Sequence, residues 1–333
     1  MIADIIVGLQ HGDCGKGKVT HHLCKKKEYT HVIRYNGGCN AGHTIMHEGE
    51  KFVTHHIPAG VFFGIKSIIG PGCVVNIEQF FKELDELEGK LGLQVRSLVK
   101  IAKNAHIITD AHLKEDREDT SIGTTKRGNG PAYRDKYNRH GMRAEQIEVL
   151  EPFVVDIYEE LHNCDIEPII LFEGAQGFGL DVDWGDYPYV TSSHCTTAGA
   201  LLNGVPPQAV RQVWGVAKIY ETYVGSKKFQ PDGIIFETLQ SIGQEYGATT
   251  GRPRQCNWLN WGNLEKAIKI NGVSDLIFNK VDILEQMQTW KIKEDDTIYN
   301  FECGEEMKDW IVGKLSKLSS RPRVYFSGNP NRI

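Results

Sequence analysis

A glycine-rich loop near the beginning of the chain constrains the fold more than any other stretch. Residues 12–18 read Gly-Asp-Cys-Gly-Lys-Gly-Lys and lie between the apolar run 5–9 and a stretch of helical character that begins near Val19. Glycines let successive backbone N–H groups turn toward one point, and the lysines and the following helix add positive charge there. This order of strand, loop and helix predicts a phosphate-binding loop in a P-loop-like α/β fold.

The loop departs from the usual pattern G-x-x-x-x-G-K-[ST] at its last position, where Val19 replaces the hydroxyl residue that binds the metal ion. Another oxygen would then have to hold Mg²⁺, and Asp13 inside the loop is the nearest candidate. A carboxylate beside phosphates is costly unless it meets a cation or takes a proton, so we expect Asp13 to take part in the chemistry. The alternative interpretation is a strand-to-helix turn that binds no ligand.

Apolar segments alternate with helical patterns along the chain, which indicates an α/β fold with a mostly parallel central sheet flanked by helices. Segments with the composition of strands are 4–10, 31–35, 67–70, 99–108, 168–173, 212–220 and 275–281. Residues 77–88 have apolar side chains at helical spacing, with Asn76 as the N-cap and Gln79 completing a capping box. Stretches without periodicity, expected to be long active-site loops, are 34–44, 121–143, 174–199 and 222–257.

Composition excludes several classes of protein. A chain of 333 residues, 40% hydrophobic and 24% charged, can bury a large core, and the lack of a Pro/Gly/Ser-rich linker favours a single domain over residues 1–333. No apolar run approaches the length of a bilayer span and no basic leader is present, so we expect a cytoplasmic protein that does not enter membranes. The eight cysteines lack metal-like spacing, and the net charge of −5 argues against nucleic-acid binding.

Further candidate site residues follow the expected strands. His43, in the glycine-rich stretch 34–44, can donate a proton near neutral pH, and Gln176 follows strand 168–173 at the end where α/β sheets bind ligands. Residues 121–143 combine adjacent hydroxyls with six cations, which indicates either a phosphate clamp or a solvated basic loop.

Two motifs in the second half of the chain point to particular ligands. Arg252 and Arg254 are two residues apart, so in an extended segment both guanidinium groups face the same way and could grip a dicarboxylate. Residues 279–282 read Asn-Lys-Val-Asp, in which the Asp282 carboxylate can accept hydrogen bonds from N1–H and the 2-amino group of guanine while the Lys280 stem covers the base. Together with the phosphate loop, this motif predicts GTP.

Seven of these motifs resemble, in the same order, those of the adenylosuccinate synthetase family. They are G-D-x-G-K-G-K, R-Y-N-G-G-C-N-A-G-H-T, I-G-T-T-K-R-G-N-G-P-A-Y, E-G-A-Q-G, Y-P-Y-V-T-S-S, A-T-T-G-R-P-R and N-K-V-D, and they cover most of residues 4–282. The short length resembles the compact archaeal and viral members. The resemblance implies a GTP- and Mg²⁺-dependent ligase of purine biosynthesis, which joins L-aspartate to C6 of a 6-oxopurine nucleotide through a 6-phosphoryl intermediate.

The resemblance also implies roles for individual residues. Asp13 would take the N1 proton of the purine, His43 would donate a proton to the transferring phosphoryl group, and Asp13 and the Gly42 carbonyl would hold Mg²⁺. The implied GTP site comprises Gly12, Gly15, Lys16, Gly17, Lys18, Thr44, Lys280, Asp282 and Ser327. The implied site for the substrate nucleotide comprises Asn40, Thr125, Gln176, Thr191, Val224, Gly225 and, from the second subunit of a homodimer, Arg139. Aspartate would be bound by Thr250, Arg252 and Arg254.

The chain departs from the family pattern beside the implied purine pocket. Residues 226–232 read Ser-Lys-Lys-Phe-Gln-Pro-Asp where the family usually has a Gly/Pro-rich stretch, and Gln255 and Asn257 replace an expected Arg and Gly. A viral branch of the family uses dGMP to make N6-succino-2-amino-2′-deoxyadenylate, a precursor of 2-aminoadenine DNA, and residues 9–10 and 231–232 resemble that branch. The retained loop carboxylate and N-K-x-D motif favour IMP. We therefore rank IMP first and dGMP second, with the host cytoplasm as the location if the chain is viral.

A rival interpretation from another class is a P-loop GTPase switch or binding protein. It would explain residues 12–18 and 279–282, but it leaves Gln176, Arg252 and Arg254 without a role. A nucleotide kinase is disfavoured because the metal-binding hydroxyl after Lys18 is missing.

Overall fold

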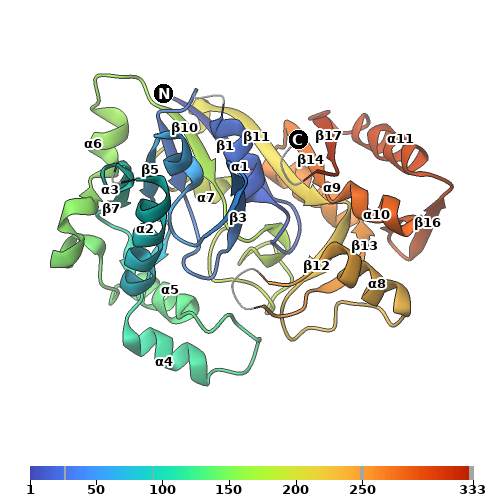
Figure 1. Cartoon of the computed structure of the whole chain (residues 1–333), viewed down its shortest axis with the longest axis horizontal. Helices are drawn as coiled ribbons and strands as arrows, with labels where there is room; N and C mark the ends of the chain where they lie inside the picture. The colour runs from blue at the N-terminus through green and yellow to red at the C-terminus, as the bar shows by residue number, and fades with distance from the viewer. Residues whose placement is uncertain (26–27, 93, 248–250, 330–333) are drawn as a thin grey trace.

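The computed structural model describes residues 1–25, 28–92, 94–247 and 251–329. A nine-stranded sheet runs through the middle of the molecule, and all its neighbouring strands are parallel (Figure 1). From edge to edge its strands are β17 (Arg323–Ser327), β14 (Asp275–Asn279), β11 (Val210–Lys218), β1 (Ile2–Gly8), β10 (Ile169–Glu173), β2 (His31–Arg34), β5 (Lys66–Ile69), β7 (Val99–Ala102) and β9 (Val154–Val155). The predicted α/β fold with a mostly parallel central sheet is confirmed.

Helices and smaller sheets surround the central sheet (Figure 1). The helices are α1 (Lys16–Cys24), α2 (Ile77–Leu91), α3 (Val95–Leu98), α4 (Asp110–Glu118), α5 (Asn129–Tyr137), α6 (Ile157–His162), α7 (Thr197–Leu201), α8 (Ile234–Gly243), α9 (Trp261–Asn271), α10 (Val281–Met287) and α11 (Gly304–Leu315). A four-stranded sheet contains β12 (Tyr220–Tyr223), β13 (Gln255–Asn260), β15 (Trp290–Glu294) and β16 (Thr297–Phe301). The remaining strands pair two by two, β3 (His43–His47) with β4 (Glu50–Thr54) and β6 (Val74–Val75) with β8 (His106–Ile107).

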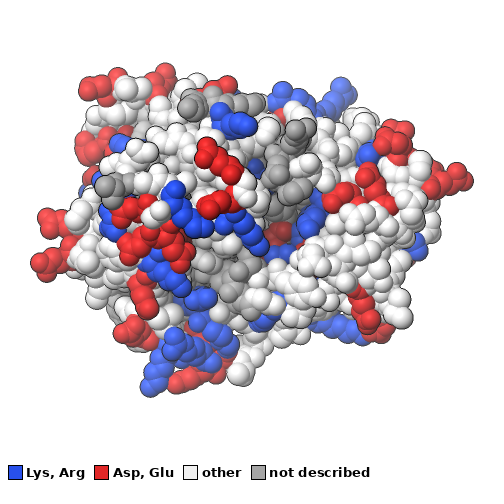
Figure 2. Space-filling view, viewed as in Figure 1, with Lys and Arg blue, Asp and Glu red and all other residues white. Residues whose placement is uncertain are grey.

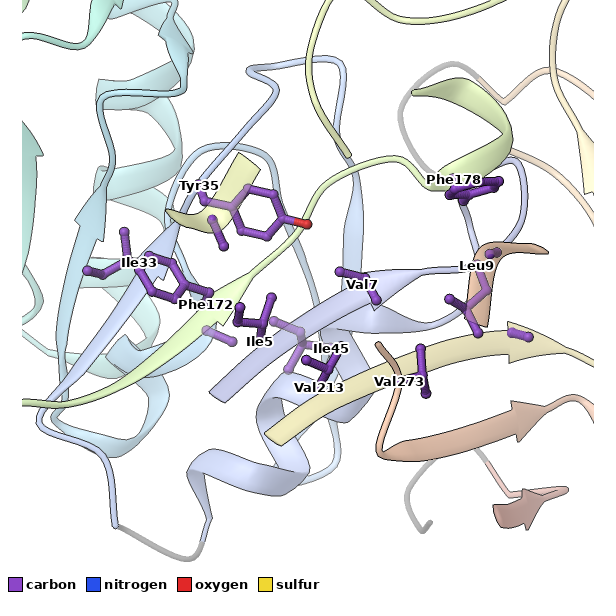
Figure 3. Packing of buried hydrophobic residues seen from close by; sticks show 14 of the residues in the cluster. Ile5, Val7, Leu9, Ile33, Tyr35, Ile45, Phe172, Phe178, Val213 and Val273 are labelled. Carbon is purple, nitrogen blue, oxygen red and sulfur yellow. The ribbon is translucent and has the colours of Figure 1, made fainter. Parts of the chain in front are cut away.

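The central sheet is buried on both faces, as expected for parallel strands covered by helices. Along β1, Ile5 and Val7 point into one apolar cluster (Figure 3), whereas Ile6 points into a second cluster together with Val19 and Leu23 of α1. Successive side chains of a strand face opposite sides, so one continuous apolar run supplies both clusters. The strand that leads into the glycine-rich loop is therefore held firmly at the centre of the molecule.

The order of the strands brings distant parts of the chain together. The chain first builds outward through β2, β5, β7 and β9, then returns to insert β10 beside β1, and finally builds outward in the other direction through β11, β14 and β17. Because all nine strands are parallel, their carboxyl ends lie along one edge of the sheet. Open α/β sheets bind ligands at this edge, where the strand order reverses.

Most of the predicted elements have a counterpart in the structure. Strands β1, β2, β5, β7, β10, β11 and β14 match the predicted segments, and α2 matches the helix expected at 77–88. The Asn76 side chain accepts a hydrogen bond from the backbone N–H of Gln79 at 2.8 Å, which confirms the predicted N-cap. The prediction of one strand over 99–108 is wrong, because the chain turns after Ala102 and residues 106–107 pair with β6 instead.

The stretches predicted to be long loops contain short helices. Helix α5 lies within 121–143 and α8 lies within 222–257, while α7 begins inside 174–199 and continues to Leu201, so the loop prediction is wrong in these parts. Helix α5 begins with the sequence Asn-Gly-Pro and has no clear apolar stripe, since only three of its nine residues are buried. A single domain over residues 1–333 stays a prediction.

Charged side chains of both signs are interspersed over the face shown in Figure 2. Several Lys and Arg side chains edge the hollow near the centre of this face. The whole chain has a net charge of −5, so these cations form a local concentration that suits the binding of phosphate groups. Within the described ranges, no helix has the length and apolarity needed to cross a bilayer.

Candidate active site

A cavity of about 750 Å³ lies at the carboxyl edge of the central sheet. Loops that follow β1, β2 and β10 form its floor, and residues from α4, α5 and the segment 223–254 form its walls. The predicted site residues that line it are Gly12, Asp13, Gly15, Lys16, Gly17, Asn40, Gly42, His43, Thr44, Thr125, Gln176, Thr191, Val224, Arg252, Arg254 and Lys280. The structure thus gathers in one cavity residues that belong to seven separate sequence motifs.

The glycine-rich loop has the geometry of an anion-binding turn. Helix α1 begins at Lys16, three residues earlier than expected, and Gly15 caps it with φ of 94°. A Cβ at Gly15 would come within 2.7 Å of Asn279 Nδ2, so both the backbone conformation and the space require glycine. The first turn of a helix has N–H groups without intrahelical partners, which suit a phosphate.

Asn279 links this loop to the end of β14. Its Nδ2 donates to the carbonyl oxygen of Cys14 at 2.8 Å, and its Oδ1 accepts from Lys18 Nζ at 2.9 Å. Our sequence analysis gave Asn279 no role of its own, although it belongs to the N-K-x-D motif. The contact fixes the distance between the phosphate loop and the predicted guanine-reading residues.

The predicted GTP residues fall into two groups. Most line the cavity, but Lys18, Asp282 and Ser327 lie beside it, where Lys18 Nζ donates to Ser327 Oγ at 2.6 Å. Burial lowers the pKa of Lys18 to about 8 even though Asp282 acts in the opposite direction. Lys280 joins the two groups, since it lines the cavity and donates to the carbonyl oxygen of Gly243 at 2.7 Å. The predicted guanine-reading pair is thus divided, with Lys280 in the lining of the cavity and Asp282 outside it.

Asp13 faces an arginine inside the cavity. Arg254 Nε donates to Asp13 Oδ2 at 2.9 Å, while Arg254 Nη1 donates to Glu245 Oε2 at 2.6 Å. Asp13 also has a φ of 51°, which is rare for a residue with a side chain. A predicted catalytic carboxylate and a predicted aspartate-binding cation are therefore in direct contact.

Glu245 is a residue that sequence analysis missed. It is fully buried and also accepts hydrogen bonds from Lys218 Nζ at 2.8 Å and the Tyr220 hydroxyl at 2.6 Å. Burial alone would raise the pKa of Glu245, but Lys218 and Arg254 outweigh it and lower the pKa to about 2. The ionised Glu245 thus holds the Arg254 guanidinium at the cavity wall.

The two arginines of the predicted aspartate site have different partners. Arg252 Nη1 donates to the carbonyl oxygen of Gly123 at 3.3 Å, whereas Arg254 binds the carboxylates of Asp13 and Glu245. Both line the cavity, as predicted. Thr250, the third predicted aspartate-binding residue, lies outside the described residues.

His43 stands at the start of β3 in contact with a buried carboxylate. Its Nδ1 is hydrogen-bonded to Glu173 Oε1, and Arg34 Nη2 donates to the same oxygen at 2.6 Å. Burial and then the charge of Arg34 lower the pKa of His43 to about 4. Burial opposes the ionisation of Glu173, but Arg34 and His43 outweigh it and hold its pKa near 2. A neutral His43 therefore donates its Nδ1–H to an ionised Glu173. Glu173 precedes the predicted Gln176 in the same motif, yet nothing in the sequence paired it with His43.

The residues predicted to surround the substrate nucleotide are mostly at the cavity wall. Asn40 Oδ1 accepts from Asn129 Nδ2 at 3.1 Å, and Thr125, Thr191 and Val224 also line the cavity. Gly225 lies just outside the lining, with its carbonyl oxygen bound by Gln255 Nε2 at 3.3 Å. Arg139 is exposed after the end of α5 and does not line the cavity of its own chain.

Four predicted site residues other than glycine have positive φ angles. These angles are 51° at Asp13, 65° at Arg139, 54° at Gln176 and 66° at Lys280. A side chain in this conformation costs on the order of 1 kcal/mol, and such strain gathers at functional sites. Among the described residues, six further ones with side chains that are not predicted site residues also have positive φ, namely Glu48, Lys126, Gln244, Gln288, Asp295 and Arg321, so this angle alone does not identify the site.

The residues that depart from the family pattern contact one another. Gln255 Oε1 accepts from the N–H groups of Phe229 and Gln230 at 2.7 and 3.1 Å, and its Nε2 donates to the Lys227 carbonyl oxygen at 2.8 Å. Asn257 Nδ2 donates to the carbonyl oxygen of Phe229 at 3.0 Å. The replacements on β13 therefore hold the altered segment 226–232 in place next to Val224.

Fold and site together define a P-loop-like enzyme that binds a nucleotide at the carboxyl edge of a parallel sheet. The sequence profile described as adenylosuccinate synthetase matches residues 5–149 and 144–325. The adenylosuccinate synthetase of Caldanaerobacter subterraneus subsp. tengcongensis is 38% identical over 347 residues, which cover 88% of this chain and 80% of the relative. The chain belongs to the adenylosuccinate synthetase family.

Solved structures agree with this assignment. The fully ligated adenylosuccinate synthetase from Plasmodium falciparum superposes with a TM-score of 0.81 at 27% identity, covering 98% of this chain and 97% of that chain. The succinoaminodeoxyadenylate synthetase of cyanophage S-2L, solved with dGMP and dATP, superposes with a TM-score of 0.72 at 22% identity, covering 92% of this chain and 97% of that chain. This second match shows that the two proteins share a fold. The protein is thus a ligase of purine biosynthesis that forms a C–N bond and uses GTP as a substrate.

Proposed function

We propose that this ligase joins L-aspartate to C6 of IMP, with GTP as phosphoryl donor, and that Asp13 and His43 are its catalytic residues. The main support for the proposal is that Asp13 lies among the phosphate-loop residues in one cavity and there contacts Arg254 of the predicted aspartate site. A base placed between a phosphate site and a carboxylate-binding cation suits a reaction in which a phosphoryl group activates the purine and an amino acid then replaces it.

The reaction divides into two steps. Asp13 takes the N1 proton, the purine O6 attacks the γ-phosphorus of GTP, the bond from that phosphorus to the β-phosphate oxygen breaks, and GDP leaves. As the negatively charged phosphates of GTP bind, His43 takes up a proton from solvent at Nε2. The Nε2–H then donates to the transferring group, while the Glu173 carboxylate at Nδ1 stabilises the positive charge of the ring. In the second step the neutral amine of aspartate attacks C6, the C6–O6 bond breaks, phosphate leaves with the O6 oxygen, and the proton lost by the amine nitrogen passes to solvent.

Mg²⁺ fits the oxygen donors at the cavity. The Asp13 carboxylate and the Gly42 carbonyl both belong to residues that line it, and Mg²⁺ prefers such ligands. The Arg254 guanidinium already sits against the Asp13 carboxylate, which indicates that this position favours a positive charge. When bound, Mg²⁺ would neutralise the charge of the GTP phosphates.

The remaining residues bind and orient the substrates. Arg252, Arg254 and Thr250 are the proposed ligands of aspartate, and Lys280 and Asp282 read guanine. The proposed ligands of the IMP phosphate are Asn40, Thr125, Gln176 and Thr191. Arg139 of the partner subunit completes this phosphate site, so the active unit is a homodimer. The cytoplasm, where both nucleotides and aspartate are abundant, is the proposed location.

The substrate assignment is tested by incubating the protein with GTP, aspartate, Mg²⁺ and either IMP or dGMP. We expect an N6-succinyl product from IMP, with GDP and phosphate released in equal amounts, a rate with dGMP at least about 10-fold lower, and no product in excess EDTA. A product from dGMP alone would move the chain to the 2-aminoadenine branch. Release of phosphate that does not depend on aspartate would favour a GTPase switch instead.

The proposed role of Arg139 predicts complementation between subunits. Asp13→Asn and Arg139→Leu homodimers should each retain below about 1% of wild-type kcat, because both active sites of each dimer lack an essential group. A heterodimer purified through two different tags has one site with Asp13 and a partner that carries Arg139, so it should recover about half of wild-type activity. An inactive heterodimer of correct mass would show that Arg139 acts in its own subunit or not at all.

A further inference from the structure

We propose that Glu173 is the positioning residue of His43, which holds one tautomer and one ring orientation so that Nε2 faces the phosphate loop. The inference rests on the catalytic role of His43 proposed above and adds a residue that the motif comparison does not assign. Glu173 ends β10 and His43 begins β3, so the contact joins the central sheet to a small hairpin beside it.

Glu173 is fully buried and has no role at the cavity surface. Its Oε1 is shared by His43 Nδ1 and Arg34 Nη2, and its Oε2 accepts from the backbone N–H of Ala59 at 2.9 Å. Each carboxylate oxygen therefore has at least one donor, and the three donors together fix the position of the carboxylate. A group fixed this firmly can fix the orientation of a neighbouring ring.

Arg34 makes the carboxylate an obligatory acceptor. Arg34 is itself only 2% exposed, and its Nη2 lies 2.6 Å from Glu173 Oε1 and 3.2 Å from His43 Nδ1. The ionised carboxylate is a stronger acceptor than a ring nitrogen and lies closer to Arg34 Nη2, so Arg34 donates to Glu173 Oε1 rather than to His43 Nδ1. A carboxylate paired with a buried guanidinium has no proton to donate, so the hydrogen between Glu173 and His43 belongs to Nδ1. Nε2 is then the nitrogen left for a substrate.

His43 lies against the first turn of α1, the helix that follows the glycine-rich loop. The first turn of α1 packs so closely on His43 that a Cβ at Gly17 would lie 2.9 Å from the His43 Cβ. Within the described part of the chain, Nε2 has no hydrogen-bond partner although it is buried. A buried nitrogen without a partner is costly, and a proton held between Nε2 and the oxygen of a phosphoryl group bound at the phosphate loop would supply the missing hydrogen bond.

A purely structural role for Glu173 has to be separated from positioning. Its bond to the Ala59 N–H could serve only to hold the 3₁₀ turn η1 (Ala59–Phe63). Glu83 holds the backbone just before this turn, since its carboxylate accepts hydrogen bonds from the N–H groups of His55, His56 and Ile57 at 2.8, 3.0 and 2.8 Å. Glu83 is 2% exposed and is not hydrogen-bonded to His43, so it provides a matched control.

The first test compares Glu173→Gln with Glu83→Gln in steady-state assays with GTP, IMP and aspartate. We expect Glu173→Gln to lower kcat about 100-fold while each KM changes less than about threefold, because the ring is misdirected but the substrates still bind. Glu83→Gln should keep kcat within about threefold of wild type. Glu173→Asp, which keeps the charge, should recover activity to within about tenfold. Equal losses of kcat in the two Gln variants, or wild-type kcat in Glu173→Gln, would overturn the proposal.

The second test does not depend on turnover. The nitrogen-15 resonances of the imidazole rings distinguish a protonated ring nitrogen from a bare one, and the His43→Asn variant identifies the His43 signals among those of the 13 histidines. We expect a protonated Nδ1 and a bare Nε2 in the wild-type protein without nucleotide, and a shift toward protonated Nε2 in Glu173→Gln without nucleotide. A bare Nδ1 in the wild type would overturn the proposal even if the ligase activity is as proposed. Conversely, failure to form a succinyl product would refute the function but leave this readout intact.

Discussion

Replacing Asp13 by Asn is expected to lower kcat at least about 1000-fold and to leave the fold intact. The amide cannot take the N1 proton and is a much weaker ligand for Mg²⁺, so both proposed functions of the side chain are lost. Asn is also the substitution that the backbone tolerates best. Asp13 has a φ of 51°, and Asn adopts this conformation more readily than other residues with a side chain.

The control is the same change at another acid of the cavity. Asp119 lines the cavity, where it accepts a hydrogen bond from the Ser121 N–H at 2.8 Å, but it has no proposed role. Asp119→Asn should keep kcat within about threefold of wild type. Circular dichroism and the thermal midpoint check the folding of both variants. Turnover by Asp13→Asn near the wild-type rate would exclude Asp13 as the base.

The parts of the site that could be predicted from sequence are those built from neighbouring residues. The loop 12–18 and the motif 279–282 each bring their groups together within a few residues, so the pattern itself contains the geometry. The strands were predictable for the same reason, since their apolar runs are local. The two-residue strand β9 and the half-exposed edge strand β17 were missed, because neither presents a buried apolar run.

The contacts that could not be predicted join residues far apart in the chain. Arg254 and Asp13 are 241 residues apart, and Arg34 and Glu173 are 139 apart. Only the insertion of β10 between β1 and β2 brings Glu173 beside Arg34, and a single sequence carries no signal for that strand order. Ion pairs between distant residues depend on tertiary structure, so sequence motifs indicate the residues that meet the ligand but not the residues that hold those side chains in position.

Replacing Arg254 by Met is expected to raise the KM for aspartate about 100-fold, with changes of less than about fivefold in the KM for IMP and for GTP. Arg254 is the proposed cation for an aspartate carboxylate, and loss of one charge-assisted pair in a partly buried site costs about 3 kcal/mol. Glu245 remains bound to Lys218 and Tyr220 in the variant, so the network at the cavity wall survives in part.

Arg211 provides the matched control for this variant. Its guanidinium binds the buried carboxylate of Asp4 through Nε at 3.0 Å and Nη2 at 2.6 Å, but it does not line the cavity. Both variants therefore remove an arginine from a buried carboxylate, and both should lower the thermal midpoint. Only Arg254→Met should change the KM for aspartate, because of these two guanidinium groups only that of Arg254 lines the cavity, where it can bind a ligand. An equal effect of the two variants on that KM would show that Arg254 acts through stability and would leave the binding of aspartate to Arg252.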